Sequence, residues 1–194
     1  MIDYGPLTGL VVVDLQNDFA DPRGSLYVRG GEEVVPFANE QIDAAVRAGS
    51  PVLYTQDWHP DSTPHFQKDG GIWPVHCVQR TWGAAFHPDL RIEGPAERKG
   101  ADGRDGYSGF SVRDPLSGDV AATELDRRLR ERGVTRIAIT GLATDYCVVE
   151  TTLDARRLGF EVTVLAEGIR AVDLQPGDGE RAIERMREAS AEIA

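Results

Sequence analysis

Cys147 occupies a position where a thiol can act as a nucleophile. The apolar run at residues 137–139 predicts a short buried strand that Gly141 ends, and a helix is expected to begin near Asp145. A cysteine in the first turn of a helix faces unpaired backbone N–H groups and the positive end of the helix dipole, which favours the thiolate. The alternative is a small apolar residue that fills the core. Cys77 lacks this strand-to-helix context and is the weaker candidate.

Other reactive side chains follow the ends of predicted strands. Asp14 ends the first strand, Asp57 and His59 follow the second, and Lys99 lies near the third. Ligands bind at the carboxyl ends of the strands in parallel sheets, so we expect these groups to meet Cys147 at one rim. There a carboxylate can take the thiol proton and return it to a leaving amine, while an ammonium lowers the thiol pKa. Spacing alone leaves open a purely structural pairing of Asp14 with Lys99.

Lysine is rare in this chain, which has 21 basic residues of which only Lys68 and Lys99 are lysine. Arginine keeps its proton and spreads its charge over a plane, whereas lysine is a compact charge that can give its proton up. We take Lys68 as an ordinary surface residue and Lys99 as a candidate for the site.

A group of histidines predicts a metal site. Asp57 and His59 are two residues apart, so in extended backbone both side chains leave one face. His65 and His76 follow in an irregular stretch, and ligand sets of Asp and His suit Zn, Fe or Mn. The alternative is a set of solvent-exposed loop histidines. His87 lies outside the group and is interpreted as structural.

The elements that must position these residues alternate between strands and helices. We expect strands at residues 9–15, 51–55, 98–100, 135–140 and 160–165, and helices at 32–48, 120–132, 146–158 and 179–189. Residues 58–95 show no sustained period, and so long a loop is unusual unless it has a function. This pattern predicts an α/β fold, a three-layer α/β/α domain with a mainly parallel central sheet, formed by residues 1–194 as a single domain.

Charge and composition restrict the classes of binding partner. The formal net charge of −11 argues against nucleic acid and anionic membranes, both of which need basic patches. No apolar run approaches membrane-spanning length, the start lacks the features of a signal peptide, and two cysteines make no disulfide framework. We therefore expect a cytoplasmic protein, and the charge says little about a small neutral substrate.

Six motifs occur in the order of a known family. They are Val-Asp-Leu-Gln-Asn-Asp-Phe at 13–19, Asp-Trp-His-Pro at 57–60, Trp-Pro-Val-His-Cys at 73–77, Lys-Gly at 99–100, Tyr-Ser-Gly-Phe at 107–110 and Gly-Leu-Ala-Thr-Asp-Tyr-Cys-Val at 141–148. Together they resemble the nicotinamidase/pyrazinamidase branch of the isochorismatase-like cysteine hydrolases. The first motif marks only the superfamily, whereas the second and third are more specific because most relatives outside this branch lack that metal site.

The resemblance implies a catalytic apparatus. Cys147 would be the nucleophile, Asp14 the general base and acid, and Lys99 the charge that holds the thiolate. The N–H groups of Ala143 and Cys147 would form the oxyanion hole, after a cis peptide bond between Leu142 and Ala143. The implied reaction converts nicotinamide and water to nicotinate and ammonia through a thioester on Cys147, with pyrazinamide as a second substrate and a place in pyridine nucleotide salvage.

The resemblance also implies a metal and a pocket. One divalent ion would hold the pyridine nitrogen, so that the carboxamide of a small neutral heteroaromatic substrate faces the thiol. Its ligands would be Asp57, His59 and His76, with His65 matching an additional ligand of some members. Phe19, Trp73 and Tyr107 match the aromatic positions that wall the ring, and flat aromatic contacts suit such a ligand.

One departure and several alternatives remain. Residues 100–106 are glycine-rich and charged where family lengths vary, which weakens the match of Tyr107 and points to a different lid over the pocket.

The alternatives are a metal-independent amidase for a ureido or carbamoyl compound, a non-catalytic binding domain, and a metal-hydroxide hydrolase with an incidental Cys147. The sequence does not determine the metal or the oligomeric state, so a homo-oligomer stays open.

Overall fold

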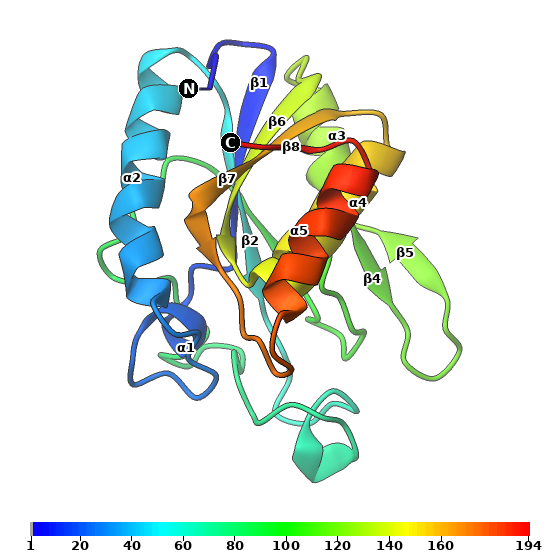
Figure 1. The fold of residues 1–194 in the computed structure, drawn as a ribbon. Coiled ribbons are helices and arrows are strands. Elements are labelled where there is room, and N and C mark those ends of the chain that lie inside the picture. Colours follow the sequence, from blue (N-terminus) through cyan, green and yellow to red (C-terminus); the bar gives the residue numbers. More distant parts are fainter. Residues whose placement is uncertain (1) are drawn as a thin grey trace.

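A six-stranded parallel sheet organises residues 2–194, which are the residues described by this computed structural model (Figure 1). Its strand order is β3-β2-β1-β6-β7-β8, and every neighbouring pair is parallel. The strands are β1 (Thr8–Val13), β2 (Val52–Asp57), β3 (Ala96–Lys99), β6 (Arg136–Leu142), β7 (Glu161–Arg170) and β8 (Glu192–Ile193). All residues of β1 and β2 are buried, as is typical of strands covered on both faces.

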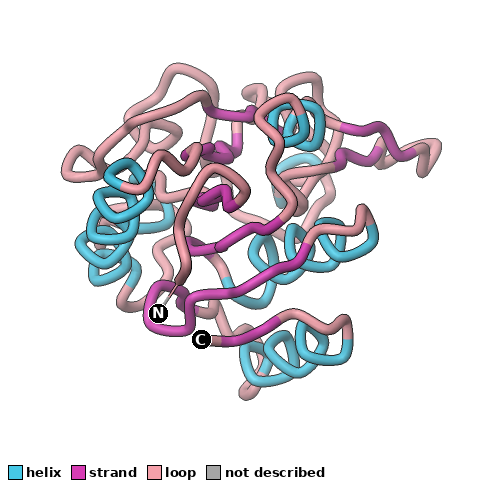
Figure 2. The backbone as a smooth tube through the Cα atoms, turned by 90° about the horizontal axis from the view of Figure 1, so that it is seen from above, coloured by secondary structure: helices cyan, strands magenta, loops and turns pink. Residues whose placement is uncertain are grey.

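Helices cover both faces of the sheet and bury two separate apolar clusters against it. On one face lie α1 (Asn17–Ala20) and α2 (Gly31–Arg47), and on the other α3 (Leu125–Arg130), α4 (Val149–Arg157) and α5 (Asp178–Glu188). The view from above shows the strands between these two groups of helices (Figure 2). The predicted three-layer α/β/α fold with a parallel sheet is confirmed.

The strand order brings the predicted reactive residues to one rim. From β1 the chain proceeds through β2 to β3 on one side and then continues with β6 on the other, so the connections reverse between β1 and β6. Asp14 follows β1, while Asp57 and Lys99 end β2 and β3 as directly paired residues. A reversal of this kind is where α/β sheets bind ligands.

The expected helix at 120–132 is wrong in its first half. Val120–Ala122 is instead a strand, β5, that pairs in antiparallel fashion with β4 (Ser111–Arg113) to form a hairpin standing away from the main sheet (Figure 1). Thr123 donates its N–H to the carbonyl of Phe110 at 2.9 Å and its hydroxyl to the carbonyl of Gly109 at 2.6 Å. These bonds hold residue 123 to the hairpin, so α3 begins only at Leu125.

The expectation that Gly141 ends its strand is also wrong, because β6 continues to Leu142. Gly141 has a φ of 123°, and a Cβ at this position would lie 2.0 Å from the carbonyl oxygen of Val13. Glycine is therefore required by the close approach of β1 to β6 just before the site.

The long irregular stretch at 58–95 is present as expected. Its only helical segment is a 3₁₀ turn at Gln67–Asp69, and Figure 1 shows the stretch as loops beneath the carboxyl ends of the strands. Isolated bridges such as Gln16 with Phe86 and His59 with Val78 tie it to the site. Within residues 2–194, no helix has the length and apolar character needed to cross a membrane.

Candidate active site

Cys147 lies in a π-helical turn, Thr144–Val148, that leads directly into α4. The N–H groups of Tyr146 and Val148 donate to the carbonyl oxygen of Ala143 at 3.1 and 3.0 Å. The N–H groups of Ala143 and Cys147 take part in neither of these bonds. The peptide bond between Leu142 and Ala143 is cis, as the resemblance implies. Cys147 is buried and lines a pocket.

The ammonium of Lys99 joins the predicted catalytic residues. Its Nζ lies 2.7 Å from Oδ2 of Asp14 and 3.5 Å from Sγ of Cys147, and it also pairs with Oδ1 of Asp57. Burial by itself would lower the pKa of Lys99, but the two carboxylates raise the pKa well above its ordinary value. Lys99 is therefore a fixed positive charge between Asp14, the thiol of Cys147 and Asp57.

Asp14 is held as a buried carboxylate of raised proton affinity. The hydroxyl of Thr55 donates to its Oδ1 at 2.7 Å, and burial raises the pKa of Asp14 although Lys99 opposes the shift. Burial also raises the pKa of Cys147 well above its usual range, and Lys99 lowers it only in part. Desolvation of the buried thiol thus opposes the thiolate that the helix start was expected to favour.

The metal-ligand candidates form a compact cluster beside this group. Ring nitrogens of His59, His65 and His76 lie within 4.8 Å of one another, and Oδ2 of Asp57 is 3.6 Å from Nε2 of His59 and 3.9 Å from Nε2 of His76. Both ring nitrogens of His59 are buried without a hydrogen-bond partner among residues 2–194. Buried polar atoms are rarely left unpaired, so the cluster fits a bound cation. The exposed-loop alternative is wrong, since all three histidines are buried.

Gln16 positions Asp57, a role that the sequence did not reveal. Its wholly buried amide accepts the N–H of Asp57 at 2.8 Å and donates to the carbonyl oxygens of Asp57 at 2.7 Å and Ala84 at 2.9 Å. The side chain thus fixes the backbone of Asp57 much as a neighbouring strand would. The first motif contains this residue, but only the contacts give it a role.

The pocket, whose empty space is about 360 Å³ with the open mouth counted, combines the thiol, aromatic walls and three of the metal-ligand candidates, Asp57, His65 and His76. Phe19, Trp73 and Tyr107 all line it, as predicted. The indole N–H of Trp73 donates to the hydroxyl of Tyr107 at 2.9 Å, and Tyr146 packs edge-on against Trp73. Sequence reasoning missed four lining residues, which are Leu26, Val28, Tyr146 and Val172. They come from loops and turns that carry no pattern for a ring pocket.

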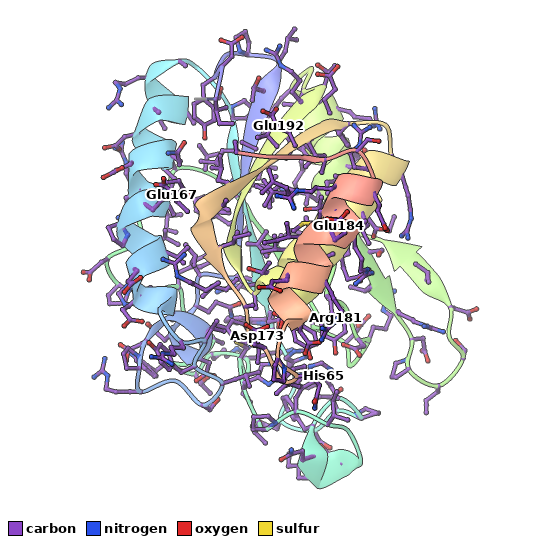
Figure 3. The ribbon with its side chains drawn as sticks, in the orientation of Figure 1. His65, Glu167, Asp173, Arg181, Glu184 and Glu192 are labelled. Atoms are coloured by element: carbon purple, nitrogen blue, oxygen red, sulfur yellow. The ribbon has the colours of Figure 1, made fainter. Side chains whose placement is uncertain are left out.

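The remaining candidates lie apart from the chemistry. Cys77 is wholly buried, burial raises the pKa of its thiol, and it does not line the pocket. The side chain of Lys68 is 47% exposed on the surface, as expected. In Figure 3, His65 and Asp173 lie in the lower part of the molecule and Glu192 lies in the upper part. A larger open hollow in that upper part contains none of the predicted site residues.

Comparison with known proteins matches this geometry. The isochorismatase domain model matches residues 8–194, nearly the whole chain. The chain belongs to the isochorismatase family. Within that family it is 37% identical to a nicotinamidase of Escherichia coli over 97% of this chain and 94% of the relative. It is also 36% identical to a nicotinamidase/pyrazinamidase of Mycobacterium tuberculosis over 96% of this chain and 98% of the relative.

A solved isochorismatase-family structure agrees with the fold. The pyrazinamidase of Pyrococcus horikoshii in complex with zinc superposes with a TM-score of 0.86 at 39% identity, covering 97% of this chain and 99% of that one. The resemblance to the nicotinamidase/pyrazinamidase branch that the motifs indicated is confirmed.

Proposed function

We propose that this isochorismatase-family chain is an amidase that hydrolyses nicotinamide to nicotinate and ammonia, and that it also accepts pyrazinamide. The observation that supports this most directly is the shared pocket, in which Cys147 faces the aromatic side chains and borders the histidine cluster. The named activities of the relatives from E. coli and M. tuberculosis point to the same reaction.

The residues around Lys99 suit acyl transfer to a thiol. Asp14 takes the proton of Cys147 as Sγ attacks the carboxamide carbon, and the raised pKa of Asp14 helps it do so. The N–H groups of Ala143 and Cys147 hold the developing oxyanion, and Asp14 returns the proton to the departing ammonia. A water molecule then gives its proton to Asp14 and attacks the thioester, which releases the acid and restores the thiol.

Asp57, His59, His65 and His76 would hold one divalent ion, of Zn, Fe or Mn. When bound, this ion supplies a Lewis acid for the ring nitrogen of the substrate. The pairing of Lys99 with both Asp14 and Asp57 keeps the base and the ligand set in fixed relation, so that the ring and the carboxamide are held together. A cytoplasmic location, a role in pyridine nucleotide salvage and a homo-oligomeric state stay predictions.

The test is ammonia release by metal-loaded protein with nicotinamide, pyrazinamide and a ureido acid side by side. We expect turnover of the two ring amides, none by Cys147→Ala, and loss of substrate affinity after chelation that added divalent metal restores. Turnover of the ureido acid alone would support the metal-independent amidase instead. Full activity of Cys147→Ala would support a metal-hydroxide hydrolase, and absence of turnover of all three substrates would refute the proposal.

A further inference from the structure

Residues 100–106 pack against the histidine cluster and do not cover the pocket. Of the described residues that line the pocket, none belongs to this stretch, so the expected lid is wrong. A Cβ at Gly100, whose φ is 80°, would lie 2.7 Å from Nδ1 of His59. The carbonyl of Ala101 accepts a hydrogen bond from Gln79 at 2.7 Å. The stretch is therefore part of the layer that surrounds the metal-ligand candidates.

Asp105 makes the closest polar contact between this stretch and the cluster. Its Oδ1 lies 3.0 Å from Nδ1 of His65, whose side chain is only 5% exposed. This oxygen is itself buried and has no aligned hydrogen-bond donor among residues 2–194, so its contact with Nδ1 of His65 is close in distance but is not aligned as a hydrogen bond. With Nδ1 facing a carboxylate, Nε2 is the ring nitrogen of His65 left for a metal. Figure 3 shows His65 among the side chains below the strands of the sheet.

The backbone of Asp105 is anchored independently of His65. Its N–H donates to the carbonyl of Arg113 at 2.7 Å, and its own carbonyl accepts the N–H of Arg113, which forms an antiparallel bridge at the end of β4. The carboxylate is thus held by a bridge to the small hairpin of β4 and β5, while His65 belongs to the irregular stretch at 58–95. Two separately anchored segments meet at this contact, so the position of the ring does not depend on one loop alone.

We propose that Asp105 is a positioning residue for the metal site, which holds His65 in the Nδ1–H tautomer and turns its Nε2 towards His59 and His76. Metal-bound histidines commonly donate their second ring N–H to a carboxylate, which fixes the tautomer and orients the ring. Asp105 would thereby make His65 the fourth protein ligand of the ion, in addition to Asp57, His59 and His76. This inference rests on the metal site of the proposed function.

The test measures the affinity of metal-free protein for Zn²⁺ by competition with a chromophoric chelator. Asp105→Ala should bind Zn²⁺ about 10- to 100-fold more weakly. Asp105→Asn, which keeps the size but not the charge, should lie between this variant and wild type. The matched control is Asp102→Ala, because Asp102 has the same charge in the same stretch but is 54% exposed and pairs with Arg104. We expect its affinity to stay within about twofold of wild type.

The variant His65→Ala separates positioning from a general charge effect. If Asp105 acts through His65, Asp105→Ala should weaken Zn²⁺ binding no further in the His65→Ala background. The visible absorption of Co²⁺-loaded protein should change in the same way for the two single variants, because both lose the same ligand. Equal weakening in both backgrounds, or an affinity of Asp105→Ala equal to that of Asp102→Ala, would overturn the inference.

Two controls keep the outcomes distinct. Thermal unfolding of the metal-free variants checks that they fold, and Asp105→Asn gives the same comparison if the alanine variant does not. A wild-type protein that hydrolyses nicotinamide while Asp105→Ala binds Zn²⁺ normally overturns only this inference. A wild-type protein that binds Zn²⁺ but releases no ammonia from ring amides overturns the proposed function and leaves the role of Asp105 standing.

Discussion

Replacing Lys99 by Met tests the electrostatic core of the site. Met keeps most of the aliphatic volume but removes the buried ammonium that Asp14 and Asp57 share. Breaking a buried ion pair by removing one partner costs about 3–5 kcal/mol, because the remaining charge stays buried. Here two carboxylates lose their cation together. We therefore expect the free energy of unfolding of metal-free protein at pH 8 to fall by at least about 3 kcal/mol.

The loss should depend on pH in a defined direction. In the wild type, burial would raise the pKa of Asp57, but Lys99 and the histidines hold it well below its usual value, so this carboxylate's stabilising contribution disappears as the pH falls. In Lys99→Met, at least one of the two carboxyls should hold its proton in the folded state, with a pKa above its unfolded value of about 3.9. The folded variant then binds more protons than the unfolded chain and gains stability on acidification, by up to about 1.4 kcal/mol per pH unit.

Urea unfolding of the metal-free proteins between pH 5 and pH 8, followed by tryptophan fluorescence, measures both effects. The difference between wild type and Lys99→Met should be largest at pH 8 and shrink towards pH 5. Lys68→Met is the matched control, because the side chain of Lys68 is 47% exposed and its removal should change stability by less than about 1 kcal/mol. A difference for Lys99→Met below about 1 kcal/mol, or one that stays constant with pH, would refute this reasoning.

Three further predictions follow from the same contacts. Gly100→Ala should weaken Zn²⁺ binding at least about tenfold, because its Cβ would meet the His59 ring; unchanged affinity in a chelator competition would contradict this. Gln16→Leu removes the amide that pairs with both the N–H and the carbonyl of Asp57, whereas the carbonyl of Ala84 keeps its bond from Gln56. Urea unfolding should therefore show a loss of about 3 kcal/mol, and a loss under about 1 kcal/mol would count against the role of Gln16. Asp14 must be ionised to act as the base, and burial raises its pKa. The value of kcat/KM for nicotinamide should therefore fall as the pH is lowered, with an apparent pKa above the ordinary 3.8. An apparent pKa below 3.8 would exclude Asp14 as the base.

Sequence patterns predicted most of the sheet because its strands are buried on both faces. Such strands are continuous apolar runs, and those of β1 and β6 were visible directly. The pattern failed at Val120–Ala122, where apolar spacing also fits a helix. The pairing of these residues with Ser111–Arg113, together with the hydrogen bonds of Thr123, decides for the strand.

The candidate site was predictable where residue type carries the chemistry. Cys147, the buried lysine and the histidines have side chains with few alternatives for nucleophilic or metal-binding roles, and their motifs resemble one family. Tyr146 and Val172 escaped because apolar and aromatic residues fill cores as readily as pockets. The contribution of Gln16 escaped because an amide reveals its partners only in three dimensions.

The sequence alone determined the parallel α/β architecture and the kinds of side chain available at the strand ends, since both follow from local periodicity and residue chemistry. Only the tertiary structure decided what those side chains do to one another. Burial raises the pKa of Cys147 despite its place at a helix start, and pairing with two carboxylates keeps Lys99 charged. Residues 100–106 support the histidines because Asp105 reaches His65 across two separately anchored segments. Desolvation and contact depend on what folds over each group, which no stretch of sequence contains by itself.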